Sequence, residues 1–171
     1  MEKLELLLEQ GNKLFNDRTP LLDQWQTIAE NFYPERADFN YQRTVGEEFG
    51  NELMNSYPAM VRRDLGNSIT SILRPTNKEW MHLRVRHRWD KIGVEGRAWL
   101  EWAEGIMRRA MYDRKTQFVR ATREADHDFA TFGQAVLQPT LNSAGDGLLF
   151  KCWHLRDVAW MESEDSSLCT I

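Results

Sequence analysis

The sequence has little of what secreted, membrane-spanning or polyanion-binding proteins usually carry. Its only two cysteines, Cys152 and Cys169, form no CxxC pair, so we expect a reduced intracellular protein with free thiols. No apolar run approaches the roughly 18 residues that cross a bilayer, and the amino terminus is acidic where a signal peptide is basic. A net charge of −4 argues against a general polyanion binder. We therefore expect a soluble protein without a membrane partner.

Recognisable catalytic and phosphate-binding motifs are also missing. Ser68, Thr70 and Ser71 have no Gly-x-Ser-x-Gly setting and no assignable base, so we interpret them as helix-packing residues. The run Gly145–Gly147 is too short for a phosphate loop and is typical of a hairpin turn. The sequence therefore predicts no enzyme, with no catalytic residues and no cofactor.

A metal site is not predicted either. Asp126, His127 and Asp128 are consecutive in a predicted helix, and consecutive residues of a helix do not face one another. We interpret these three as a solvated helical face. The other histidines are isolated in sequence and join a site only if the fold brings them there: His82, His87 and His154. We expect no tightly held metal.

Large aromatic residues, in contrast, are abundant, and apolar residues recur at helical spacing. Seven Trp and eight Phe supply a substantial core, with a surplus that can serve interfaces. Apolar residues three and four apart, which share one helical face, predict five helices, at residues 2–16, 20–33, 56–73, 94–112 and 116–132. Gly133 is typical of a helix C-terminus.

Each predicted helix carries an apolar stripe that we expect to face inward. Beyond the first helix, the stripes contain Leu22, Trp25, Ala29 and Phe32; Val61, Leu65, Ile69 and Ile72; Trp99, Trp102, Ala103, Ile106 and Ala110; and Phe118, Ala125, Phe129 and Phe132. We expect Trp99, Trp102 and Phe129 to form a core between the last two helices. On that expectation, Trp102→Ala costs about 3–5 kcal/mol of stability.

Two other regions have the patterns of strands. Residues 80–88 alternate apolar with basic side chains, which predicts a half-buried strand with a cationic outer face. Residues 135–141 and 148–155 flank a turn and predict a hairpin, and residues 158–161 begin a further strand. Together with the helices, this pattern predicts an α+β fold that is predominantly helical, with a small, mostly antiparallel sheet.

We divide the chain into three parts. Residues 1–50 form an N-terminal helical arm with a long loop, residues 51–162 form the α+β region, and residues 163–171 form an irregular tail. The loop at 35–50 has no obvious local partner, and the strand-like segment 157–160 has no successor to pair with. We expect both to be exposed, with fast amide hydrogen exchange at residues 35–50 and 157–171 beside protected residues 94–132.

The most conspicuous polar cluster lies on the predicted strand at 80–88. Its members, which we treat as candidates for contact with nucleic acid or with another protein, are Trp80, Arg84, Arg86, Arg88 and Trp89. Basic side chains interleaved with aromatic ones hold the nucleic-acid backbone and stack on bases. The alternative is a solvated strand face whose arginines pair with acidic neighbours or with another subunit.

With these elements placed, the chain resembles the N-terminal part of the portal protein of short-tailed bacteriophages, also called the head-to-tail connecting protein. The similar pieces are Trp25–Pro34, the helix, Arg-Pro turn and Trp-x-x-Leu segment of Gly66–Leu83, the helix pair 99–133, and Phe150–Trp160. Each piece is weakly specific by itself. Their order and spacing together carry the resemblance, which covers most of residues 20–162.

The resemblance implies a portal wing-like fold and a structural virion protein. Subunits of that family form a ring of about a dozen copies at one capsid vertex, through which DNA is packaged and ejected. The implied partners are further copies of the chain, capsid, scaffolding and tail proteins, and the DNA in the ring. The implied location is the virion neck, with assembly in the host cytoplasm. A small nucleic-acid-binding module using the basic strand 84–88 is the alternative function.

The chain also departs from the family pattern. Family members are much longer and continue into a stem, a clip and a crown, and residues 166–171 do not resemble the family. A truncated or frameshifted portal gene and an independent short paralogue both fit this departure. We expect the isolated chain to be marginally soluble or to bind other subunits through its uncovered surfaces.

Overall fold

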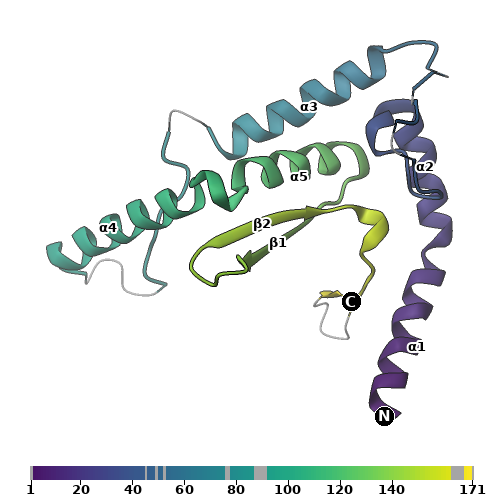
Figure 1. Cartoon of the computed structure of the whole chain (residues 1–171). Coiled ribbons are helices and arrows are strands. Elements are labelled where there is room, and N and C mark those ends of the chain that lie inside the picture. Colours follow the sequence, from purple (N-terminus) through teal and green to yellow (C-terminus); the bar gives the residue numbers. More distant parts are fainter. Residues whose placement is uncertain are drawn as a thin grey trace.

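The structure is a computed structural model that describes residues 2–44, 46–48, 50–51, 53–75, 78–86, 92–162 and 168–170 (Figure 1). Over these residues it contains five α-helices: α1 (Glu2–Asp17), α2 (Thr19–Phe32), α3 (Tyr57–Leu73), α4 (Val94–Met111) and α5 (Phe118–Phe132). Four short strands form two antiparallel pairs: β1 (Val136–Leu141) with β2 (Leu148–Trp153), and β3 (Trp160–Glu162) with β4 (Leu168–Thr170). The predicted α+β, mainly helical fold is confirmed.

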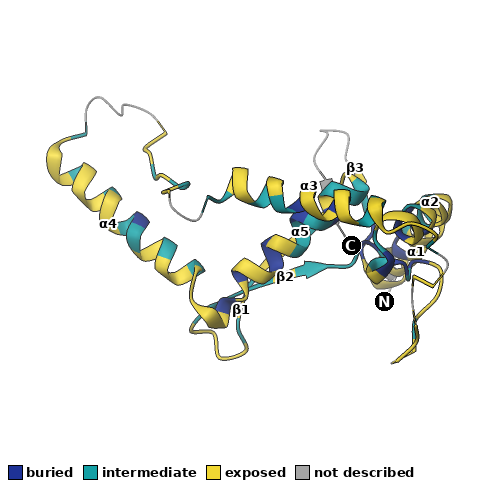
Figure 2. Ribbon diagram, turned by 90° about the horizontal axis from the view of Figure 1, so that it is seen from above, coloured by how far each residue is buried: buried dark blue, intermediate teal, exposed yellow. Residues whose placement is uncertain are grey.

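The elements form an elongated arrangement around α5. Helix α5 lies beside α3 and packs on the β1–β2 hairpin, while α1 and α2 stand at one end and α4 extends from the other (Figures 1 and 2). The predicted turn and helix cap are also confirmed, because the hairpin register joins Leu141 to Leu148 and Gly133 ends α5 with a φ of 72°. None of the described helices has an apolar stretch long enough to cross a membrane.

The apolar core lies between α2, the segment that follows it at 37–39, and later segments around Phe132 and Leu155. Trp25 is at its centre, with its ring centroid 5.7 Å from that of Phe39 and 6.2 Å from that of Phe132. Leu155, from the short helical turn after β2, completes this cluster and is fully buried. The inward stripe of α2 is therefore confirmed at its two central residues, Trp25 and Ala29.

The two segments expected to lack partners instead cover each other and the core. Ala37 and Phe39 are buried. The Gln26 side chain forms hydrogen bonds with the backbone of both residues, accepting from Phe39 N at 2.8 Å and donating to Ala37 O at 3.2 Å. Val158 and Ala159 are buried as well. The expectation of exposure was wrong for these residues, because sequence spacing does not show which distant segments meet. The expectation that the strand at Trp160 has no later segment to pair with was also wrong, since β3 pairs with β4.

The predicted core between the fourth and fifth helices was also wrong. Trp99, Trp102 and Phe129 are exposed to 61%, 60% and 53%. Helix α4 has no extensive contact with another described element, and most of its surface is open (Figure 2). An apolar stripe identifies a helical face whose burial is favourable, but the covering surface can belong to the same chain or to another.

Residues 80–86 form no strand. They are described without regular secondary structure and run beside α4, whereas residues 87–91 lie outside the described part of the chain. This connection is held against α4 by side-chain interactions of Glu104, and not by hydrogen bonds between two backbone strands. The alternation of apolar and basic residues that predicted a strand at 80–88 was therefore misleading. Apolar residues at every second position also occur in an extended segment that lies with one side against a helix.

Candidate interaction surfaces

A polar seam joins α3 to α5. The side of α3 that faces α5 carries Arg62, Gly66, Thr70 and Arg74 at one-turn spacing. Arg74 forms an ion pair with Asp126, and Thr70 Oγ1 donates to the same carboxylate at 2.7 Å. The apolar stripe predicted to face inward points elsewhere. Ser68 and Ser71, expected to pack between helices, are exposed and donate to carbonyls of their own helix.

His127 fills the space that the absent side chain of Gly66 leaves in this seam. Arg62 Nη1 lies 3.1 Å from His127 Nδ1, and a guanidinium only donates, so this nitrogen accepts and carries no proton. Burial lowers the pKa of His127, and the charges of Arg62 and Arg123 lower it further. The imidazole is therefore held neutral as a packing and hydrogen-bonding group.

Substitution of Gly66 tests how tightly this seam is packed. A Cβ at Gly66 would lie 2.8 Å from Cε1 of His127 and closer still to Nδ1, so the ring must move away from Arg62. We expect Gly66→Ala to lower the free energy of unfolding by about 1–2 kcal/mol, because overpacking outweighs the gain in helix propensity. Gly105→Ala in α4 is the matched control, since nothing lies within 4 Å of its Cβ.

Gly105→Ala should stabilise the chain by up to about 1 kcal/mol, as expected for an unobstructed helical position. Urea denaturation followed by circular dichroism measures both changes. Equal effects of the two substitutions would contradict the close packing of His127 on Gly66.

Among the residues that the structure describes, Asp128 is the most deeply buried charged group, at 1% exposure. Arg36 donates to both of its oxygens, from Nε at 3.1 Å and from Nη2 at 2.7 Å. Burial raises the pKa of Asp128, and the Arg36 charge opposes that shift. Burial, followed by the charge of Asp128, raises the pKa of Cys152 to about 12, which makes this thiol unreactive. The interpretation of Asp126 and Asp128 as solvated was wrong.

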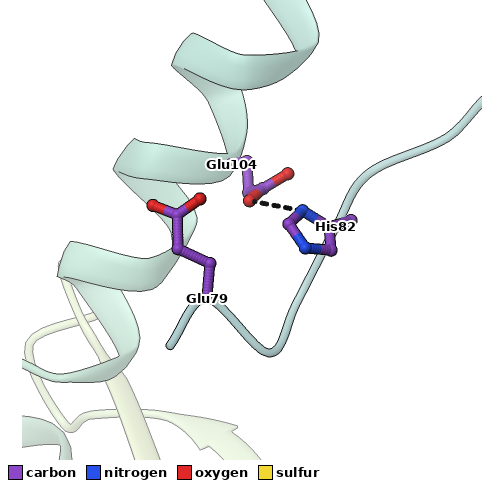
Figure 3. Close-up of side chains that lie close together, drawn as sticks. All are labelled: Glu79, His82 and Glu104. Carbon is purple, nitrogen blue, oxygen red and sulfur yellow. Dashed lines mark ion pairs between the residues drawn. The ribbon is translucent and has the colours of Figure 1, made fainter. Parts of the chain in front are cut away.

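A third polar group lies between α4 and the connection that follows α3. Glu79 and His82 project from the connection towards Glu104 of α4 (Figure 3). His82 Nδ1 is 3.2 Å from Glu104 Oε1, and the backbone N–H of Leu83 donates to Glu104 Oε2 at 3.1 Å. Arg108 forms an ion pair with Glu79 at 2.7 Å. Sequence reasoning missed this group, because Glu104 is far from the other two along the chain.

Of the cluster predicted at 80–89, the structure describes Trp80, Arg84 and Arg86. Trp80 is half-buried: its indole N–H donates to the Tyr112 hydroxyl at 2.9 Å and its ring stacks on Phe118 at 6.3 Å between centroids. Arg84 and Arg86 are exposed in the irregular connection. Arg88 and Trp89 lie outside the described residues. The ring of Trp80 therefore packs on Phe118, while part of the side chain remains exposed and lines a cleft.

A cleft of about 790 Å³ opens beside Trp80, between α3, α5 and the end of α4. Its basic lining residues are Arg74, Lys78, Arg108, Arg109 and Arg123. Two of these charges are already used, since Arg74 pairs with Asp126 and Arg108 pairs with Glu79. The cleft is thus less cationic than its composition indicates.

Many large apolar side chains are exposed on the described part of the chain. On α3 they follow one another at four-residue spacing: Tyr57, Val61 and Leu65. With Phe32 of α2, these three line a groove of about 460 Å³. A second uncovered set lies on α4, where Trp99, Trp102 and Ile106 are exposed. Patches of this kind are typical of protein–protein interfaces.

Comparison with protein families shows which family the chain matches. The family of bacteriophage head to tail connecting proteins matches residues 4–171, which is nearly the whole chain. The expectation that residues 166–171 do not resemble the family was therefore wrong. Comparison with curated protein sequences gives no match. Proteins of this family are structural components of the virion neck, where they join the capsid to the tail and contact proteins of both. On the extent of this match, the chain belongs to the bacteriophage head-to-tail connecting proteins.

Proposed function

We propose that the chain is a portal-type connector subunit that assembles into a closed ring at the capsid vertex, through which DNA is packaged and ejected. The observation that carries the proposal is the uncovered apolar surface of α3 and α4 on a chain of this family. Copies of the chain, together with capsid, scaffolding and tail proteins, are the proposed partners. The resemblance to portal proteins indicates about a dozen subunits per ring.

A ring needs two different complementary faces on each subunit, because contact is head to tail and not face to same face. The chain offers two such faces. The groove between α2 and α3 is concave and apolar. Helix α4, which carries the exposed Trp99 and Trp102, lies at the opposite end of the molecule from α2 (Figure 2). Each tryptophan can bury about 150–250 Å² at an interface, so two of them supply a strong anchor. We propose that α4 of one subunit packs against the α2–α3 groove of the next.

The oligomeric state tests this proposal. We expect light scattering on the purified chain, alone and mixed with a full-length portal protein, to detect large assemblies that survive high salt. Trp99→Asp combined with Trp102→Asp should convert these assemblies to monomers without changing the circular dichroism spectrum, because both side chains are already exposed in the monomer. Glu101→Gln, an exposed change on the same helix, is the control. A chain that stays monomeric under all these conditions would contradict the proposal.

Nucleic-acid binding by residues 84–88 is the alternative function. The exposure of Arg84 and Arg86 favours it, while the packing of Trp80 on Phe118 and the net charge of −4 weigh against it. Binding of single-stranded DNA that weakens steeply with salt, and that is reduced by Arg84→Ala with Arg86→Ala, would support this alternative.

A further inference from the structure

We propose that Glu79, His82 and Glu104 form a binding site for a divalent transition-metal ion, and that Zn²⁺ is the ion their chemistry suits best. The three side chains converge from the connection after α3 and from the middle of α4 (Figure 3). One ligand atom from each lies within 4.8 Å of the others. The sequence-based expectation of no metal site considered histidines and carboxylates that are near one another in sequence, whereas this group is assembled by the fold.

The geometry is close to that of a metal site. Zinc binds imidazole nitrogen and carboxylate oxygen at about 2.0–2.2 Å, which places neighbouring ligand atoms of a tetrahedral site about 3.3 Å apart. His82 Nδ1 and Glu104 Oε1 already have this spacing, at 3.2 Å. Glu79 is exposed and lies in a segment without regular structure, so rotation of its side chain brings the third ligand in. The imidazole favours zinc over Ca²⁺ and Mg²⁺, which prefer oxygen ligands.

The burial of Glu104 is a second and independent observation. Helix α4 leaves its tryptophans in solvent, yet the one residue that it buries is a glutamate, exposed to 7%. A buried carboxylate is costly unless a cation or several hydrogen bonds compensate it. Within the described part of the chain, the charged partner of Glu104 is His82, which is positive only when protonated. A bound divalent ion would supply that charge while the imidazole is neutral.

The surroundings orient the proposed ligands. The N–H of Leu83 donates to Glu104 Oε2, which turns Oε1 towards His82, so that an ion can bind between these two atoms. Arg108 forms an ion pair with Glu79, the third proposed ligand, at 2.7 Å. Partners of this kind fix the direction of metal ligands and raise affinity. A metal here would fasten the connection at 79–83 to α4, a helix that has few other contacts.

Calorimetric titration of the metal-free chain with ZnCl₂ tests the site. We expect one zinc ion per chain, and an affinity that falls at least about tenfold in His82→Gln and in Glu104→Gln. Glu101→Gln, the same kind of change one turn away on α4, should leave the affinity unchanged. MgCl₂ should give no comparable binding.

Hydrogen exchange on the unmodified chain gives a second measurement that does not depend on whether a variant folds. Zinc should slow exchange at the Leu83 amide, because this N–H is bonded to the ligand Glu104. If Glu104→Gln fails to fold, His82→Gln still decides the question, since His82 is an exposed side chain. Absence of stoichiometric zinc binding would overturn the proposal. Binding that is equally strong in His82→Gln would also overturn it, by placing the ion elsewhere.

Discussion

Trp25→Ala is expected to lower the free energy of unfolding by about 3–5 kcal/mol, the cost of removing a fully buried large aromatic side chain. Trp25 is exposed to only 3%, and its ring contacts Phe39, Phe132 and Trp160. These residues come from three separate parts of the chain, so the cavity would weaken the contact of α2 with all of them. Chemical denaturation monitored by tryptophan fluorescence and circular dichroism measures the change.

Trp102→Ala is the matched control and should cost the monomer less than about 0.5 kcal/mol, because the side chain is mostly in solvent there. Both variants are measured at protein concentrations at which the chain is monomeric, since Trp102 lies at the proposed subunit interface. This reverses the expectation from the sequence, which placed Trp102 in the core. A loss of several kcal/mol in Trp102→Ala, or a loss below about 1 kcal/mol in Trp25→Ala, would show that the core lies elsewhere than between α2, Phe39 and Leu155.

Asp128→Ala is expected to destabilise the chain by about 3–5 kcal/mol, because it leaves the partly buried Arg36 without its counter-charge. The Asp128 side chain is almost inaccessible, and the pairing with Arg36 is bidentate. This ion pair joins α5 to the segment that carries Ala37 and Phe39 into the core. Its loss should therefore disturb the core as well as α5. Thermal and urea denaturation of the variant measure the effect.

Two further variants separate the buried charge from other effects. Asp64→Ala breaks an exposed ion pair with Arg63 and should change stability by less than about 0.5 kcal/mol. Arg36→Met combined with Asp128→Leu removes both charges and should recover much of the loss, since apolar replacements of a buried pair are often tolerated. A double variant as unstable as Asp128→Ala would show that hydrogen bonds and shape, and not the unpaired charge, dominate at this position.

Local patterns predicted the elements of the fold well. Apolar spacing located all five described helices within a few residues, and the turn at 142–147 placed the hairpin. Gly133 ends α5 as its position indicated. These features depend on residues close in sequence, so the sequence carries their physical cause directly.

Patterns that depend on a distant partner were predicted poorly. The apolar stripe of α2 faces the core, whereas Val61 and Leu65 in the apolar stripe of α3 face outward. The contact between α3 and α5 is formed instead by arginine, threonine and aspartate side chains. The candidate residues at 80–89 were chosen for their own alternation. The structure places Trp80 in packing and instead assembles Glu79, His82 and Glu104, which no local pattern connects.

The positions of helices and turns, and the presence of large apolar faces, follow from the sequence, because helical spacing and glycine at a helix end act within a few residues. Which faces are buried, the burial of Asp128 and Glu104, and the closing of the core over Trp25 by residues 37–39 and 155–159 follow from how distant segments meet. A face is buried only when a second surface covers it. A stripe of apolar side chains is stabilised by any complementary surface, in the same chain or in another, and the stripe itself does not specify which one covers it.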